Sequence, residues 1–94
     1  MELKRVVVTG LGALTPVGNT MPETWENIKK GVSGAGPITH FDASKFKATF
    51  ACEVKNFNAT EFIARKEARK MDLYEQCALV AAMQAIKDCG RDLE

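Results

Sequence analysis

The sequence is poor in the side chains from which metal and redox sites are built. It has one histidine, His40, and three cysteines, Cys52, Cys77 and Cys89, with no C-x-x-C pair among them. This number and spacing fit neither a zinc site nor a disulfide framework. Unpaired cysteines are typical of a reducing compartment. We therefore expect a cytoplasmic protein that has neither a metal nor a cofactor.

A strong excess of one charge and long apolar runs are also missing. Thirteen basic and twelve acidic side chains leave a net charge of +1, which argues against a nucleic-acid partner. The apolar run at residues 6–8 is too short for a signal-peptide core, and no run approaches the length of a membrane span. We expect no membrane partner, and 94 residues are enough for one small domain at most.

The opening segment looks at first like a dinucleotide-binding loop. The β-branched run at residues 6–8 predicts a buried strand that leads into a glycine-containing turn. Gly10 and Gly12 supply the first two glycines of G-x-G-x-x-G, but Thr15 stands at the third position. A proline follows where the phosphate-binding helix should have begun. The motif is incomplete, and the sequence argues against a nucleotide site.

A well-marked helix follows this turn. Thr20 and Glu23 have the spacing of a capping box, in which each satisfies a backbone amide of the first turn. The apolar residues of the helix recur at helical spacing, so we expect them to pack in the core. They are Met21, Trp25, Ile28 and Val32.

The middle of the chain predicts less regular structure. Residues 37–48 read as an irregular stretch with a helical turn near residues 42–46, and residues 49–55 predict a second strand. Asn58 then has a capping position for a short helix.

The last helix carries the strongest packing signal. Asp72 and Glu75 have the spacing of a capping box, which predicts the start of the helix, and Gly90 predicts its end. Residues 77–83 are apolar without interruption and cover every face of the helix, which is typical of a helix buried on all sides. Because so short a chain has little material to surround it, we expect this chain to be part of a larger protein or to pack on a partner chain.

Several stretches share an informative order and spacing, although none is specific alone. They are residues 5–12, 15–19, 25, 33–34, 40–42 and 65–72. In this order they resemble the amino-terminal end of β-ketoacyl-acyl carrier protein synthases, most of all the type II elongating enzymes of bacterial fatty-acid synthesis. The resemblance implies an α/β, thiolase-like fold of layered α-β-α-β-α architecture. Residues 1–94 would be an amino-terminal fragment of its first half, with no complete second domain.

The resemblance also implies an activity. Enzymes of this family are acyltransferases that act as homodimers and join malonyl-acyl carrier protein to an enzyme-bound acyl thioester by decarboxylative Claisen condensation. The family's nucleophile lies in a Thr-Ala-Cys elbow and its two histidines lie later, so none is expected among these 94 residues. The cysteines and His40 are expected to have packing or hydrogen-bonding roles, and the chain alone is expected to be inactive.

A cluster of charge at residues 65–70 is the remaining candidate site. Four basic side chains and Glu67 give it a local net charge of +3. Charge alone favours a solvated face, and without interleaved aromatic residues the cluster does not indicate nucleic-acid binding. The resemblance implies instead that Lys66, Arg69 and Lys70 dock acyl carrier protein, with Arg65 beside them.

Other interpretations stay open at the level of the sequence. A polyketide ketosynthase or its chain-length-factor partner would share much of this region. A free-standing module could use the basic cluster to hold an acidic protein, but its all-apolar helix argues against a folded monomer. An α/β fragment of unrelated function would not explain the order of the matching stretches.

Overall fold

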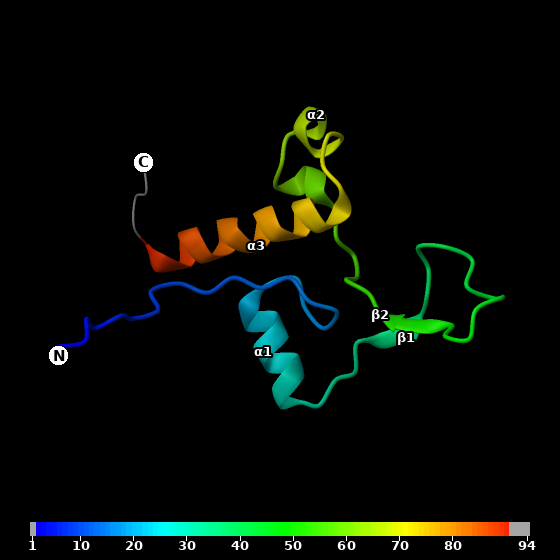
Figure 1. Cartoon of the computed structure of the whole chain (residues 1–94), viewed down its shortest axis with the longest axis horizontal. Coiled ribbons are helices and arrows are strands. Elements are labelled where there is room, and N and C mark those ends of the chain that lie inside the picture. The colour runs from blue at the N-terminus through cyan, green and yellow to red at the C-terminus, as the bar shows by residue number, and fades with distance from the viewer. Residues whose placement is uncertain (1, 91–94) are drawn as a thin grey trace.

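The computed structural model describes residues 2–90 (Figure 1). The fold is α/β, with more helix than strand. The elements in chain order are α1 (Met21–Lys29), β1 (Ala35–Pro37), β2 (Phe50–Cys52), the 3-10 helix η1 (Ala59–Glu61), α2 (Arg65–Ala68) and α3 (Leu73–Cys89).

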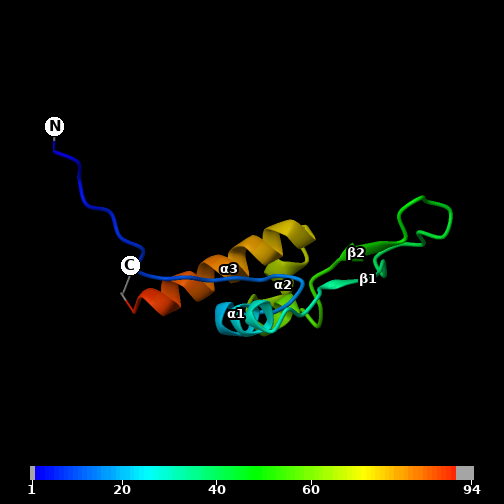
Figure 2. The same cartoon turned by 90° about the horizontal axis from the view of Figure 1, so that it is seen from below.

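The described chain is elongated, with extents of 56 × 37 × 28 Å. Both views show the segment before α1 running alongside α3, while the β1–β2 hairpin projects at the other end (Figures 1 and 2). The core lies where η1 and α2 fold onto α3. It consists of Ala59, Ile63, Ala68 and Val80, and Val80 is only 1% exposed.

The predicted strand at residues 6–8 is wrong for the described structure. This segment is extended but pairs with no other strand among residues 2–90, and it swings away from the body of the molecule (Figure 2). Val6 is 88% exposed and Val8 is 78% exposed. A β-branched run favours extended backbone, but it forms a strand only where a neighbour accepts its hydrogen bonds.

The start of α1 follows its capping signal with one difference. The Thr20 hydroxyl accepts a hydrogen bond from Glu23 N at 3.2 Å, as predicted. The Glu23 carboxylate, however, accepts from the amide of Asn19 at 3.4 Å rather than from that of Thr20. The predicted apolar stripe is not in the core, since Trp25 is 52% exposed. Thr24, whose hydroxyl donates to Gly18 O, is the buried residue of α1.

The strand predicted over residues 49–55 is shorter, and its partner was missed. β2 covers only Phe50–Cys52 and pairs antiparallel with β1, with Ala35 opposite Cys52. β1 has the sequence Ala-Gly-Pro, which has little strand propensity, and forms through this pairing. The predicted turn near residues 42–46 is present, because the amide of Phe46 donates to Ala43 O at 3.0 Å.

The helix α3 ends as predicted but is not covered on all sides. Gly90 closes it in the left-handed conformation at φ 68°. Asp72 occupies the N-cap position without a side-chain cap hydrogen bond, which differs from the expected capping box. The Val80 face packs in the core and residues 10–13 lie against Ala81 and Ala85, but Leu79 and Met83 remain 39% and 40% exposed. Residues 2–90 therefore cover only part of the surface of α3, whose residues 77–83 are apolar on every face.

Candidate protein-docking site

The basic cluster lies on a short helix that is anchored by one alanine. α2 spans Arg65–Ala68, and its Ala68 is 5% exposed and packs in the core. The four basic side chains of residues 65–70 are all exposed, so the buried alanine turns the charges outward. Figure 1 shows α2 at the edge of the molecule beyond α3, away from the N-terminal segment.

Backbone and side-chain hydrogen bonds hold α2 in place at the start of α3. The amide of Ala68 donates to Ala64 O at 2.9 Å, and that of Arg69 donates to Arg65 O at 3.1 Å. The amide nitrogen Nε2 of Gln76, on α3, donates to Ala68 O at 2.9 Å. The two backbone bonds close the turn of α2 and the Gln76 bond ties it to α3, so the charged side chains project from a defined backbone.

The charges of the cluster are uncompensated within the described part of the chain. An ion pair there joins Lys29 to Glu26 at 2.8 Å, and His40 Nε2 lies 3.5 Å from a Glu53 oxygen. Neither involves residues 65–70, although Glu67 is in α2 itself. Four cations on one small surface are therefore available to an acidic partner.

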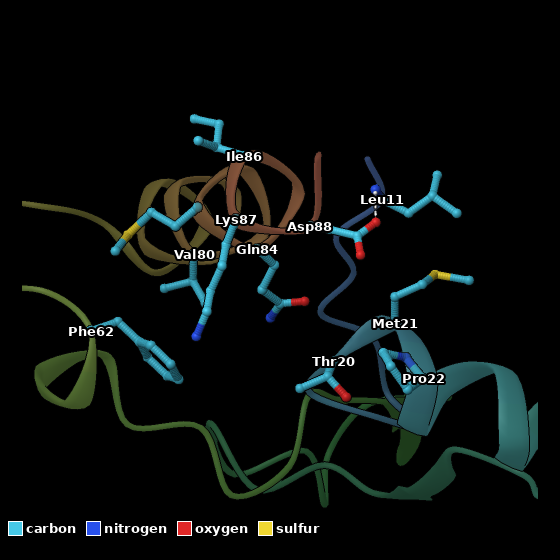
Figure 3. Close-up of a pocket in the computed structure, with 11 residues that line it drawn as sticks. Leu11, Thr20, Met21, Pro22, Phe62, Val80, Gln84, Ile86, Lys87 and Asp88 are labelled. Carbon is cyan, nitrogen blue, oxygen red and sulfur yellow. Dashed lines mark hydrogen bonds between the residues drawn. The ribbon is translucent and has the colours of Figure 1, made fainter. Parts of the chain in front are cut away.

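A groove lies between the start of α1 and α3 (Figure 3). It measures about 970 Å³, and apolar side chains such as Leu11, Met21 and Phe62 contribute to its lining. Asp88, another lining residue, accepts a hydrogen bond from the amide of Leu11 at 2.9 Å, drawn as a dashed line in Figure 3. Its lining residues include no cysteine or histidine, so the groove has no nucleophile of the type that thioester chemistry requires.

The residues that could carry chemistry are scattered, and Cys52, for which a packing role was expected, is exposed. Cys52 lies in β2, Cys77 is half-buried on α3, and Cys89 donates through Sγ to Ile86 O at 3.0 Å. Within residues 2–90, no group of three or more His, Cys, Asp or Glu side chains is placed to hold a metal ion. Likewise, no helix in that range is long and apolar enough to cross a membrane.

His40 lies in a hydrogen-bonded corner beside Glu53. The pKa of the Glu53 carboxyl is lowered from its ordinary value of 4.5, chiefly because the Thr39 hydroxyl donates to it. That bond measures 2.8 Å, and the amide of His40 donates to the same carboxylate at 3.4 Å. These contacts order the loop after β1, in which His40 bonds to Glu53 through its backbone amide.

Sequence reasoning missed a clamp between the opening segment and α3. Gln84 Oε1 accepts from the amide of Ala13 at 3.1 Å, and Gln84 Nε2 donates to Asn19 O at 2.7 Å. The signal was a polar pair, Gln84 and Asp88, at i, i+4 spacing directly after the apolar run of residues 77–83. The clamp also explains Gly12. Its α-carbon lies so close to α3 that a Cβ there would overlap the Ala81 carbonyl oxygen.

Comparison with known proteins identifies the family. The profile described as "Beta-ketoacyl synthase, N-terminal domain" matches residues 3–94. The chain belongs to the β-ketoacyl synthase family. This result confirms the resemblance that the order of short stretches indicated.

Curated members of the β-ketoacyl synthase family named "3-oxoacyl-[acyl-carrier-protein] synthase 2" are similar over almost the whole chain. The protein of Synechocystis sp. (strain ATCC 27184 / PCC 6803 / Kazusa) is 53% identical over 88 residues, 94% of this chain and 21% of the relative. That of Staphylococcus aureus (strain COL) is 50% identical over 96% of this chain and 22% of its own. That of Vibrio harveyi is 47% identical over 99% of this chain and 22% of its own.

A solved structure of the family supports the fold. "The ishigamide ketosynthase/chain length factor" matches with a TM-score of 0.84 and 35% identity, covering 92% of this chain and 21% of that one. The expected thiolase-like α/β fold is thereby confirmed. The chain spans about a fifth of the length of the curated relatives it matches.

Proposed function

We propose that this chain is the amino-terminal part of a β-ketoacyl-acyl carrier protein synthase, an acyltransferase that elongates fatty acyl chains. Its reaction would be the decarboxylative Claisen condensation of malonyl-acyl carrier protein with an enzyme-bound acyl thioester. The proposal is supported by 47–53% identity to relatives whose name states that they are 3-oxoacyl-[acyl-carrier-protein] synthases. Residues 1–94 would form part of the amino-terminal half of a homodimeric, cytoplasmic enzyme.

Within that enzyme, this segment has two roles. The first is structural, since α3 carries apolar residues such as Leu79 and Met83 that the described chain leaves partly exposed. The nucleophilic cysteine and the histidines that stabilise the enolate would come from the rest of the enzyme. Cys52 lies in a strand, and Cys77 and Cys89 lie within α3 beyond its first turn. None of the three has the helix N-terminal position that activates a thiolate, so they take no part in the proposed chemistry.

The second role is to dock acyl carrier protein through Lys66, Arg69 and Lys70. The observation that carries this proposal is the exposed, uncompensated charge of the cluster on an anchored helix. A carrier that delivers a thioester and then leaves needs fast association more than tight binding. Exposed charges at the rim of an interface supply this, because they steer encounter and fix orientation.

The test is a double charge reversal, Arg69→Glu with Lys70→Glu, in the natural polypeptide that carries residues 1–94. Carrier affinity, measured by calorimetry or fluorescence anisotropy, should fall by about tenfold or more, and its dependence on salt should weaken. Lys45→Glu with Lys47→Glu is the matched control, because it changes the net charge equally on an exposed loop between β1 and β2. Equal losses in both variants, or no loss in either, would reject docking at α2.

A ketosynthase or chain length factor of polyketide synthesis is the second candidate, favoured by the structural match of the same name. Its identity of 35% lies below the 47–53% shared with the fatty-acid synthases, which makes it the weaker candidate. A chain-length-factor partner would lack the nucleophilic cysteine of its family. Condensation activity of the natural polypeptide by itself would exclude the chain-length-factor role.

A further inference from the structure

A small hollow lies beside α2 on the side that faces η1. It measures about 300 Å³ and is open to solvent. Its lining residues come from three elements and are Asn58, Ala59, Thr60, Arg65, Ala68, Arg69 and Gln76. Ala59 and Ala68 are 8% and 5% exposed, so the floor of the hollow is the edge of the core. The hollow is therefore built on packed residues rather than on a loose loop.

The arginines and the lysines of the basic cluster differ in their position relative to the hollow. Arg65 and Arg69 line it, one helical turn apart, whereas Lys66 and Lys70 do not. A guanidinium presents a planar fork of donors that matches a carboxylate, while an ammonium acts as a compact, hydrated point charge. The two arginines are thus positioned for directional hydrogen bonding, and the two lysines are positioned for long-range attraction.

The side chains of Asn58 and Gln76 line the hollow, and each uses one of its two polar groups in hydrogen bonds within the described chain. The Asn58 Oδ1 atom already accepts bonds from Thr60 N at 3.1 Å and Thr60 Oγ1 at 2.6 Å, which leaves the Asn58 amide NH₂ as a donor. Gln76 Nε2 is engaged with Ala68 O and fixes the α2 backbone. Among residues 2–90, neither Arg65 nor Arg69 has a carboxylate within ion-pair distance.

From this arrangement we infer that the hollow between η1 and α2 receives a side-chain carboxylate of the docked carrier, held by Arg65 and Arg69 with the Asn58 amide beside them. The inference rests on the proposed function in taking acyl carrier protein as the acidic partner. It adds Arg65 and Asn58 to the docking surface, and it assigns the arginines and lysines different tasks. The arginines hold the complex, and Lys66 and Lys70 speed its formation.

The two tasks predict opposite kinetic effects. A buried or half-buried bidentate pair acts mainly on dissociation, while rim charges act mainly on association. Arg65→Lys with Arg69→Lys keeps both positive charges but removes both guanidinium groups and their paired hydrogen-bond donors. We expect its dissociation rate to rise by about tenfold while the association rate stays within about twofold. Lys66→Ala with Lys70→Ala should instead lower the association rate by about fivefold, with the effect fading at high salt.

The experiment is stopped-flow binding of apo acyl carrier protein to the natural polypeptide and its variants. The apo form is used because it offers only protein groups, so any effect of the arginines is due to side chains of the carrier. Lys45→Arg with Lys47→Arg is the control for exchange of cationic side chains elsewhere on the surface. It should change neither rate, and thermal unfolding of each variant confirms that the fold is kept.

The outcomes separate the carboxylate hollow from docking at α2 as such. A faster dissociation confined to Arg65→Lys with Arg69→Lys supports the hollow. If that variant dissociates at the rate of the unsubstituted protein while Arg69→Glu with Lys70→Glu still weakens binding, the hollow is refuted and docking at α2 stands. If the unsubstituted protein does not bind the carrier, both are overturned.

Discussion

Replacement of Gly12 by alanine tests how the opening segment lies against α3. A Cβ at this position would overlap the Ala81 carbonyl oxygen and lie 2.7 Å from Ala85 N, and both are backbone atoms of a helix. Ordinary van der Waals contact begins near 3.4 Å, so the segment must move away from α3 by at least 3.4 − 2.7 = 0.7 Å. A rigid helix cannot absorb this shift by turning a side chain.

The shift breaks the clamp that holds the segment. The hydrogen bond from Ala13 N to Gln84 Oε1 is already 3.1 Å long, and a further 0.7 Å takes it beyond hydrogen-bonding distance. The bond from Leu11 N to Asp88 Oδ2, at 2.9 Å, would weaken in the same way. Two lost bonds and the overpacking strain together predict a loss of about 2–4 kcal/mol in the free energy of unfolding.

Urea denaturation of the natural polypeptide measures this loss, with Gly36→Ala as the matched control. A methyl group added at Gly36 would meet no atom within 4 Å, and this residue does not need a positive φ. Its replacement should therefore change the free energy of unfolding by less than about 1 kcal/mol. Equal stability of the Gly12→Ala variant and the unsubstituted protein would refute the close packing of residues 10–13 on α3.

Three further changes test other parts of the fold. The Lys55 ammonium donates to three backbone carbonyl oxygens at 2.7–3.1 Å, so Lys55→Met should cost roughly 1–3 kcal/mol in urea denaturation. Val80→Ala, at the most buried core position, should cost about 2 kcal/mol in the same assay. Because the folded pKa of Glu53 is lowered, its contribution to stability is present above pH 4.5 and is lost as the pH falls through the folded pKa. Glu53→Gln should remove that acid sensitivity from amide exchange in the β1–β2 hairpin, and an unchanged pH profile would contradict the assignment.

Local signals allow much of the helical structure to be predicted. Thr20, Asn58 and Gly90 mark helix ends because each satisfies a backbone group within a few residues, and all three do so in the structure. The strand expected at residues 6–8 and the burial expected for Trp25 are wrong, because both depend on partners distant in sequence or outside the described chain. β1 could not be predicted because its pairing with β2, rather than its own sequence, makes it a strand.

The candidate site was predictable only in part. The exposure of Lys66 and Lys70 follows from the cost of burying unpaired charges, which depends on residue type alone. The hollow between η1 and α2 was not predictable, because it depends on how Asn58 and Arg65 are brought together by the fold. The separate placement of arginines and lysines within one cluster is likewise a property of the structure.

The central claim, that acyl carrier protein docks on α2, is tested most directly by zero-length carbodiimide cross-linking of the carrier to the natural polypeptide. The reagent joins carboxylates to amines that touch, and mass spectrometry locates the joined lysines. Docking at α2 predicts cross-links from carrier carboxylates to Lys66 and Lys70, which high salt suppresses. Cross-links concentrated at Lys45 and Lys47, or spread evenly over the exposed lysines, would contradict it.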